Sequence, residues 1–173
     1  AMGYASLDAN TTGIDNTAIG SQALTSAQTA SYNTAVGARA LQTCTGSGQV
    51  AVGEDALMSM GSGTQNIAMG QSALRLLTTG NYNIAIGANA LATAGTYSSN
   101  TAIGQAALNA NTGDNNTAVG FNTLLDNTTG TQNVSMGAYA ASNITTGSYN
   151  TVVGYSALGT ATTASNLTAF GFR

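Results

Sequence analysis

Side chains able to carry out acid, base or nucleophilic chemistry are scarce in this chain of 173 residues. It holds six acidic residues, three arginines and one cysteine, and it has no histidine. Histidine is the commonest general acid or base and a frequent metal ligand, so its absence removes most enzymatic schemes. The composition predicts a protein that is not an enzyme, with no catalytic residues, no metal site and no cofactor.

Glu54 and Asp55 are the one adjacent pair of carboxylates. Glycosidases use two carboxylates that converge on the substrate, whereas neighbouring residues of an extended segment point apart. Asp55 also holds the repeat position that Arg39 holds one repeat earlier, which predicts an ion pair between neighbouring repeats.

The remaining reactive or charged residues are isolated. Cys44 has no activating base near it in sequence, which indicates a small buried or loop residue. The other aspartates lack the glycine-rich pattern of calcium-binding repeats; they are Asp8, Asp15, Asp114 and Asp126. A net charge of −3 gives no basic surface for nucleic acid, and no apolar run approaches the roughly 20 residues of a membrane span.

The sequence that carries these residues is an internal repeat that extends over nearly all of the chain. One glycine recurs every 17 residues, with two steps of 16, and a turn that needs φ > 0 explains it. We call these the repeat glycines; the nine central ones are Gly20, Gly37, Gly53, Gly70, Gly87, Gly104, Gly120, Gly137 and Gly154. The repeat predicts an all-β fold, a parallel β-solenoid of about ten 17-residue coils forming one domain over residues 1–173.

A short β-branched segment precedes each repeat glycine, as in Asn16-Thr17-Ala18-Ile19. Alternation predicts a strand, and we expect its larger residues, such as Thr17 and Ile19, to face the interior. The small residues between them would then face outward and contact other copies of the chain. This expected oligomer face consists of Ala18, Ala35, Ala51, Ala68, Ala85, Ala102, Ala118, Ser135 and Val152.

An amide residue opens each of these segments and predicts a hydrogen-bonded amide ladder at a corner of the coil. Its asparagines are Asn16, Asn33, Asn66, Asn83, Asn100, Asn116, Asn133 and Asn150, with Gln49 in the remaining coil. Tyr32, Tyr82 and Tyr149 directly precede three of these amides, and their scattered distribution favours corner packing over a sugar-stacking platform. An Ala-Leu pair follows most repeat glycines, as in Ala23-Leu24 and Ala107-Leu108. We expect its leucine to face the interior from a second short strand or a helical turn, which the sequence leaves open.

The phrase Asn-Thr-Ala-Ile-Gly-x-x-Ala-Leu resembles the Asn-Ser-Val-Ala-Ile-Gly-x-x-Ser-x-Ala repeat of trimeric autotransporter adhesin heads of the YadA-like type. It resembles still more closely the Asn-Thr-Ala-Val-Gly-Tyr-x-Ala-Leu repeats of phage tail fibres and related bacterial surface fibres, which residues 121–124 and 155–158 match. The resemblance implies a left-handed β-roll, a homotrimer, and a stalk or head used in attachment. The 17-residue period is longer than that of the adhesin heads, and a neck motif is missing.

We therefore expect a rod or head segment of an extracellular trimeric fibre, at a bacterial cell surface or in a phage tail fibre, cut from a longer protein. The expected partner of the chain is further copies of itself in a homotrimer. We expect it neither to bind nucleic acid nor to insert into a membrane. Two alternatives stay open. One is a carbohydrate- or receptor-binding tip, and the other is an ice-binding solenoid, against which the threonine pairs speak because they are adjacent (Thr11-Thr12, Thr78-Thr79, Thr128-Thr129 and Thr145-Thr146).

Overall fold

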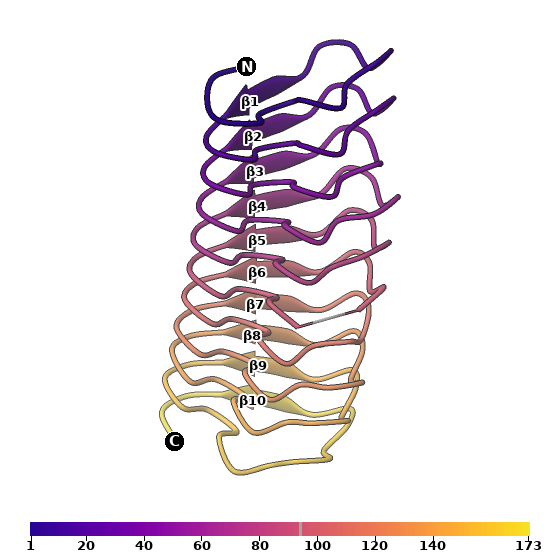
Figure 1. Ribbon diagram of the computed structural model, residues 1–173. Coiled ribbons are helices and arrows are strands. Elements are labelled where there is room, and N and C mark those ends of the chain that lie inside the picture. The colour runs from indigo at the N-terminus through magenta and orange to yellow at the C-terminus, as the bar shows by residue number, and fades with distance from the viewer. Residues whose placement is uncertain (94) are drawn as a thin grey trace.

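The computed structural model describes residues 1–93 and 95–173 and has the form of a parallel β-solenoid (Figure 1). Its strands form one sheet in chain order, each paired in parallel with the next. The expected all-β solenoid is thereby confirmed. The strands of the described chain are β1 (Thr17–Ile19), β2 (Thr34–Val36), β3 (Val50–Val52), β4 (Ile67–Met69), β5 (Ile84–Ile86), β6 (Thr101–Ile103), β7 (Thr117–Val119), β8 (Val134–Met136), β9 (Thr151–Val153) and β10 (Thr168–Phe170).

The register of the sheet follows the repeat. Thr17 pairs with Thr34, a step of 17 residues, whereas Thr34 pairs with Val50, a step of 16. The 16-residue coil is one residue shorter in an exposed loop. In this coil the buried Cys44 and Gly46 are two positions apart, whereas in the preceding coil the equivalent buried residues, Ala27 and Ala30, are three positions apart. The strands keep their alignment because the change is confined to this loop.

The interior of the coil contains the alanine column, contrary to our expectation of an outward oligomer face. Every member is at most 1% exposed, while the flanking strand residues are partly or largely exposed, as in the pattern of β1. The prediction was wrong for the whole set: Ala18, Ala35, Ala51, Ala68, Ala85, Ala102, Ala118, Ser135 and Val152.

The width of the coil explains this orientation. Alternation along a strand places two sets of side chains on opposite faces but leaves open which face is inside. The fully buried leucines, such as Leu24, Leu41 and Leu57, fill the interior from the turn. Interiors pack to high density, so alanine fits on the sheet side, and the larger Thr, Val and Ile side chains take the outward positions.

The segment after each repeat glycine is neither a second strand nor a helix. After Gly20, for example, Gln22 and Leu24 both have positive φ (58° and 53°). Ala23 lies between them, and both Ala23 and Leu24 are buried. Adjacent strand residues would face opposite sides, so the left-handed residues allow both Ala23 and Leu24 to point inward. Leu24 N–H donates to Ala40 O at 3.0 Å, so hydrogen bonds along the rod continue through this turn.

Two hydroxyl residues replace interior alanines in the same coil and contact each other. Thr123 stands where other coils have the alanine of Ala-Leu, and Ser135 stands in the alanine column. Both are buried, and Thr123 Oγ1 donates to Ser135 Oγ at 2.9 Å. Ser135 Oγ in turn donates to Ala140 O at 3.1 Å. Both buried hydroxyl groups therefore have hydrogen-bond partners, as buried polar groups in proteins generally do.

Within residues 1–93 and 95–173, no helix has the length and apolar character needed to cross a bilayer.

Candidate functional site: the sheet face and an aromatic corner

The repeat glycines adopt the conformation that the sequence predicts. From Gly20 to Gly154 their φ angles lie between 124° and 140°, a region that other residues rarely enter. Each repeat glycine also lies against the backbone of the next: a Cβ on Gly87 would be 2.5 Å from Gly104 O. The column therefore fixes both the turn and the close stacking of successive coils.

The amide column forms a continuous hydrogen-bonded ladder, which confirms the prediction. Asn83 N–H donates to Asn66 Oδ1 at 2.9 Å, and Asn100 N–H donates to Asn83 Oδ1 at 3.0 Å. Asn83 Nδ2 also donates to Tyr97 O at 2.9 Å. Gln49 takes the same role, because its Oε1 accepts from Asn66 N–H at 3.0 Å. From Asn33 to Asn150 these side chains are at most 1% exposed, so the ladder is an internal structural element.

The outward side of the ten strands is a continuous surface that carries no charged residue. We call it the sheet face. It contains two residues from each strand, all of them Thr, Val, Ile, Met or Phe. In β5 and β6, Ile86 and Ile103 are each 37% exposed, and Met136 of β8 is 46% exposed. The residues are Thr17, Ile19, Thr34, Val36, Val50, Val52, Ile67, Met69, Ile84, Ile86, Thr101, Ile103, Thr117, Val119, Val134, Met136, Thr151, Val153, Thr168 and Phe170.

The charged residues in the middle of the rod form a small cluster on the turns that follow β2, β3 and β4. Arg39 Nε lies 2.6 Å from Asp55 Oδ1, which confirms the predicted ion pair between coils. Arg39 Nη2 also lies 3.0 Å from Glu54 Oε1, so the two carboxylates converge on one guanidinium. Our expectation that they diverge was wrong because residues 54 and 55 lie in a turn. Hydrogen bonding and attraction to Asp55 raise the pKa of Arg39.

Cys44 is fully buried, and its Sγ–H donates to Gly46 O at 3.2 Å. Burial disfavours the thiolate and raises the pKa of Cys44 to about 12. The thiol is therefore held in its neutral, unreactive form, as the sequence predicts for a small buried residue.

Alkaline pH is expected to destabilise the fold through Cys44. An unfolded cysteine has a pKa of about 8.5, so its contribution is complete below that pH. It is lost as the pH rises toward 12, by roughly 1.4 kcal/mol for each pH unit above 8.5. Urea unfolding between pH 8 and 11 measures this slope. Cys44→Ala is the control, since Ala27 fills the same place one coil earlier, and an equal slope in both proteins would contradict the assignment.

The tyrosines before the amide column do not pack into the corner, as we had expected. Tyr32, Tyr82 and Tyr149 are 62%, 61% and 59% exposed, and each has a positive φ near 60°. The amide that follows each tyrosine turns inward into the ladder, and the tyrosine side chain consequently projects into solvent.

The first hydroxyl of each threonine pair also has a structural role. Thr78 Oγ1 donates to Gly95 O, and Thr128 Oγ1 donates to Thr145 O, both at 3.0 Å. Thr11 and Thr145 make equivalent bonds to the next coil. These pairs form hydrogen bonds between coils. The threonines that recur in register on an outward surface are those of the first strand position, and the ice-binding alternative stays open for them: Thr17, Thr34, Thr101, Thr117, Thr151 and Thr168.

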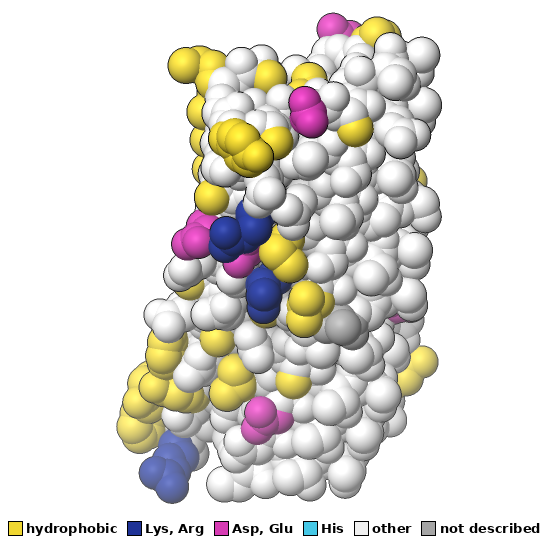
Figure 2. Space-filling model, viewed as in Figure 1, with side chains coloured by type: hydrophobic (Ala, Val, Ile, Leu, Met, Phe, Trp, Pro, Cys, Tyr) yellow, Lys and Arg dark blue, Asp and Glu magenta, His cyan; other side chains and the backbone are white. Residues whose placement is uncertain are grey.

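An aromatic ladder lies on the turn that follows the strands near the C-terminal end, and our reading of the sequence missed it. The centroids of Phe121 and Tyr139 are 5.2 Å apart, those of Tyr139 and Tyr155 are 5.9 Å apart, and those of Tyr155 and Phe172 are 5.5 Å apart. Figure 2 shows hydrophobic side chains gathered at this edge of the rod, most densely toward the C-terminal end.

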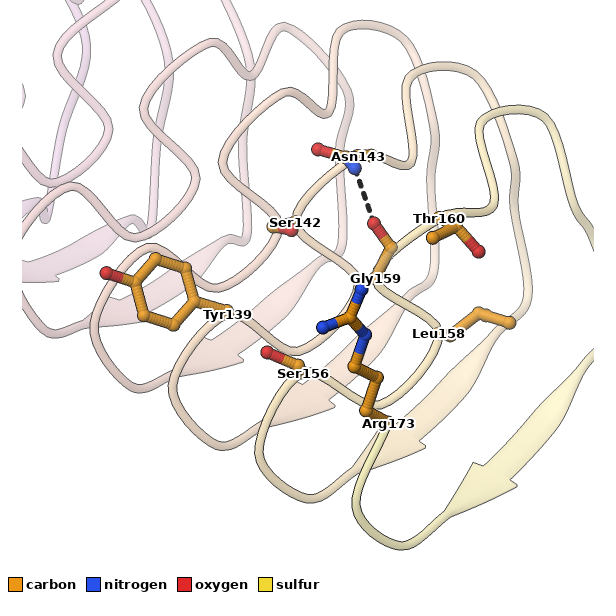
Figure 3. Close-up of a pocket in the computed structure, with 8 residues that line it drawn as sticks. All are labelled: Tyr139, Ser142, Asn143, Ser156, Leu158, Gly159, Thr160 and Arg173. Carbon is orange, nitrogen blue, oxygen red and sulfur yellow. Dashed lines mark hydrogen bonds between the residues drawn. The ribbon is translucent and has the colours of Figure 1, made fainter.

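A hollow of about 460 Å³ adjoins this ladder (Figure 3). Tyr139 lines it together with hydroxyl, amide and guanidinium groups from the last two coils. Asn143 Nδ2 donates to Gly159 O on the floor of the hollow. Figure 3 shows the guanidinium of Arg173 beside Gly159 and Ser156. The remaining lining residues are Ser142, Leu158 and Thr160.

Within the part of the chain that the structure describes, no three histidine, cysteine, aspartate or glutamate side chains gather as a metal site would require. The fold and its surfaces define a class, the parallel β-solenoid repeat proteins. Comparison with known proteins finds no matching family model, no matching curated protein and no matching solved structure.

Proposed function

We propose that this chain is a non-catalytic rod segment of an extracellular fibre, and that three copies associate side by side through the sheet face. In this proposal the fibre belongs to a bacterial cell surface or a phage tail and holds an attachment module away from it. The left-handed winding and the trimer come from the resemblance to adhesin heads and tail fibres. The sheet face is the observation that supports self-association.

The sheet face is too apolar and too continuous to suit an isolated chain. Soluble monomers rarely expose contiguous apolar patches beyond a few hundred Å². Here two outward columns extend over all ten strands without a charged residue. Fourteen of their twenty residues are Val, Ile, Met or Phe, and the other six are threonines in the first column. Covering this surface would remove apolar area from water along the whole rod, at roughly 25 cal/mol for each Å².

The spacing of the face favours a second copy of the same chain as its partner. Parallel strands lie about 4.8 Å apart, so the outward side chains form ridges with that period. A surface with another period would lose alignment within a few coils, whereas an identical solenoid stays aligned over ten strands. The absence of charge on the face also removes like-charge repulsion between copies.

The hydrogen bonds between coils suit a mechanical role. Strand pairing, the amide ladder and the threonine hydroxyls all connect one coil to the next along the rod. From Asn33 to Asn150, each amide in the ladder is bonded to the coil before it and the coil after it. A rod of this kind resists extension because many such bonds must break together.

Sedimentation equilibrium tests the proposal. The chain is expected to sediment at three times the 17.1 kDa of one copy. Ile86→Glu places a carboxylate in the middle of the sheet face and is expected to give 17.1 kDa monomers, because burying an unpaired charge is costly. Thr79→Glu is the matched control, since it adds the same charge to an exposed loop of the same repeat. A wild-type chain that sediments as a monomer at micromolar concentration would refute self-association.

A further inference from the structure

Three exposed tyrosines lie in a column along one long side of the sheet face. The residue directly before each amide of the ladder has a positive φ in every coil of this column. A bulky side chain is unusual at such angles, yet Tyr32, Tyr82 and Tyr149 adopt them and remain between 59% and 62% exposed. We call this column the strand-start edge, and from β1 to β9 it consists of Asp15, Tyr32, Gly48, Gln65, Tyr82, Ser99, Asn115, Gln132 and Tyr149.

A second column lies along the opposite side of the sheet face. The strands are all parallel, so their starts lie along one side of the sheet and their ends along the other (Figure 1). We call the residues that directly follow the repeat glycines the strand-end edge. From β1 to β9 they are Ser21, Ala38, Glu54, Gln71, Ala88, Gln105, Phe121, Ala138 and Tyr155.

The two edges cannot touch each other within one chain. In each coil they are six residues apart, as Tyr82 and Ala88 are. The extended strand between them, here Ile84–Ile86, holds them roughly 15–20 Å apart. A match between the two edges therefore needs an explanation outside the single chain.

The edges are matched in size, coil by coil. Alanine stands on the strand-end edge in three coils, and in these coils the strand-start edge has Tyr32, Tyr82 or Gln132. The glycine of the strand-start edge, Gly48, shares its coil with the larger Glu54. The remaining pairs are Asp15 with Ser21, Gln65 with Gln71, Ser99 with Gln105, Asn115 with Phe121 and Tyr149 with Tyr155. Two glutamines suit an amide hydrogen bond, and two tyrosines suit a stacked ring pair.

A cyclic assembly brings the two edges together. When the sheet faces of three copies point toward a rotation axis parallel to the rods, their strands follow one another around that axis in the same sense. The strand-end edge of one copy then meets the strand-start edge of the next. A rotation does not shift the copies along the rod, so the residues that share a coil meet at one height.

We propose that the strand-start edge of each copy packs in register on the strand-end edge of the next copy, with Tyr32 and Tyr82 seated over Ala38 and Ala88. This inference rests on the proposed self-association through the sheet face and adds its direction and register. Tyrosine is enriched among the residues that dominate binding at protein interfaces, which explains why these rings are retained at an unusual φ.

The edges supply a choice of register that the sheet face lacks. A shift of one copy by one coil would keep nine of the ten strands in contact, so the strands distinguish poorly between registers. The same shift would place Tyr82 against Gln71 or Gln105 instead of Ala88. Large side chains would then meet large ones, and the copies would be held apart.

Sedimentation equilibrium of a double-mutant cycle tests the edge contact. Tyr82→Ser leaves a gap opposite Ala88, and Ala88→Gln places a second large side chain opposite Tyr82. Each change is expected to raise the concentration at which half of the chains are trimeric by at least about tenfold. The double variant carries the pair that Ser99 and Gln105 form in the next coil, so it is expected to assemble within about threefold of the wild-type chain.

The outcomes separate this proposal from self-association itself. Both new side chains already occur at the same repeat positions in the next coil, so the variants are expected to fold, which circular dichroism checks. Single variants that assemble like the wild type, or a double variant weakened by the sum of both losses, would overturn the edge contact and leave the trimer standing. A monomeric wild-type chain would instead refute self-association.

Disulfide cross-linking tests the register directly. In a Cys44→Ala background, Gln65→Cys and Gln71→Cys place thiols on the two edges of one coil. A disulfide requires Cα atoms within about 7 Å, so these thiols cannot bond within one chain. Oxidation is expected to join three chains covalently, as non-reducing electrophoresis shows. Gln65→Cys with Ala88→Cys is one coil out of register and serves as the control. A trimer that fails to cross-link, or equal cross-linking of the control, would overturn the proposed register.

Discussion

Gly87→Ala is expected to destabilise the solenoid by roughly 3–5 kcal/mol, combining backbone strain with a clash that cannot relax. Gly87 has a φ of 132°, where an L side chain is strained. A Cβ there would lie 2.5 Å from the carbonyl oxygen of Gly104 and 2.6 Å from its carbonyl carbon. Both atoms belong to the backbone of the next coil, so relief requires the two coils to separate.

Urea unfolding followed by circular dichroism measures the effect, and Gly171→Ala is its matched control. Gly171 has the same φ of 132°, but a Cβ there meets nothing within 4 Å. The control therefore carries the strain without the clash. Stability in repeat proteins depends on contacts between neighbours, so Gly87→Ala should also divide unfolding into two transitions. If the two variants lose equal stability, the repeat glycines serve the turn and not the stacking of coils.

The position of each turn could be predicted from the sequence because one residue type, glycine, recurs there. Repeat glycines at a fixed period predicted where each turn falls and how the strands would stack, and the register confirms this, as in the pairing of Ala85 with Ala102. The side of the strand that faces inward was not predictable from alternation alone. Ala85 and Ile86 alternate equally well with either one inside, and the choice depends on the space that Leu74 and Leu91 already occupy.

The conformation of the turn after the repeat glycine could not be predicted from the sequence, because it depends on backbone angles that the residue types do not indicate. Ala90 and Leu91 both point inward because Asn89 and Leu91 adopt φ values of 58° and 50°. Asparagine tolerates positive φ, but leucine adopts it rarely. A leucine at this position therefore does not indicate a left-handed turn. Hydrogen bonds between coils hold it, such as that from Leu91 N–H to Ala107 O at 3.1 Å.

The amide ladder and the aromatic ladder differ in how easily each could be found in the sequence. The amide ladder repeats one residue type at one position, so aligning the repeats revealed it. The aromatic ladder changes position, since Phe121 follows its repeat glycine directly while Tyr139 stands two residues after its own. A column-by-column alignment separates these rings, although any search for one aromatic residue in each successive turn would have found them.

Asn83→Leu is expected to destabilise the fold by about 3–6 kcal/mol, because it leaves several buried polar groups without partners at about 1–3 kcal/mol each. Asn83 Oδ1 accepts hydrogen bonds from Asn100 N–H at 3.0 Å and from Asn100 Nδ2 at 3.2 Å. Asn83 Nδ2 donates to Asn66 Oδ1 at 3.0 Å and to Tyr97 O at 2.9 Å. Leucine removes all four bonds and offers no replacement, and these groups are sealed from water.

Asn83→Gln separates the lost hydrogen bonds from the change in volume, since glutamine and leucine are similar in size. The chain already places glutamine in the ladder: Gln49 Oε1 accepts from Asn66 N–H, and Gln49 Nε2 donates to Gly63 O. We therefore expect Asn83→Gln to be more stable than Asn83→Leu by at least about 2 kcal/mol in urea unfolding. Hydrogen exchange at the Asn100 amide should accelerate in the leucine variant and stay slow in the glutamine variant. Equal stability of the two would mean that the column is held by packing, and that the hydrogen bonds joining one amide to the next add nothing to the rod.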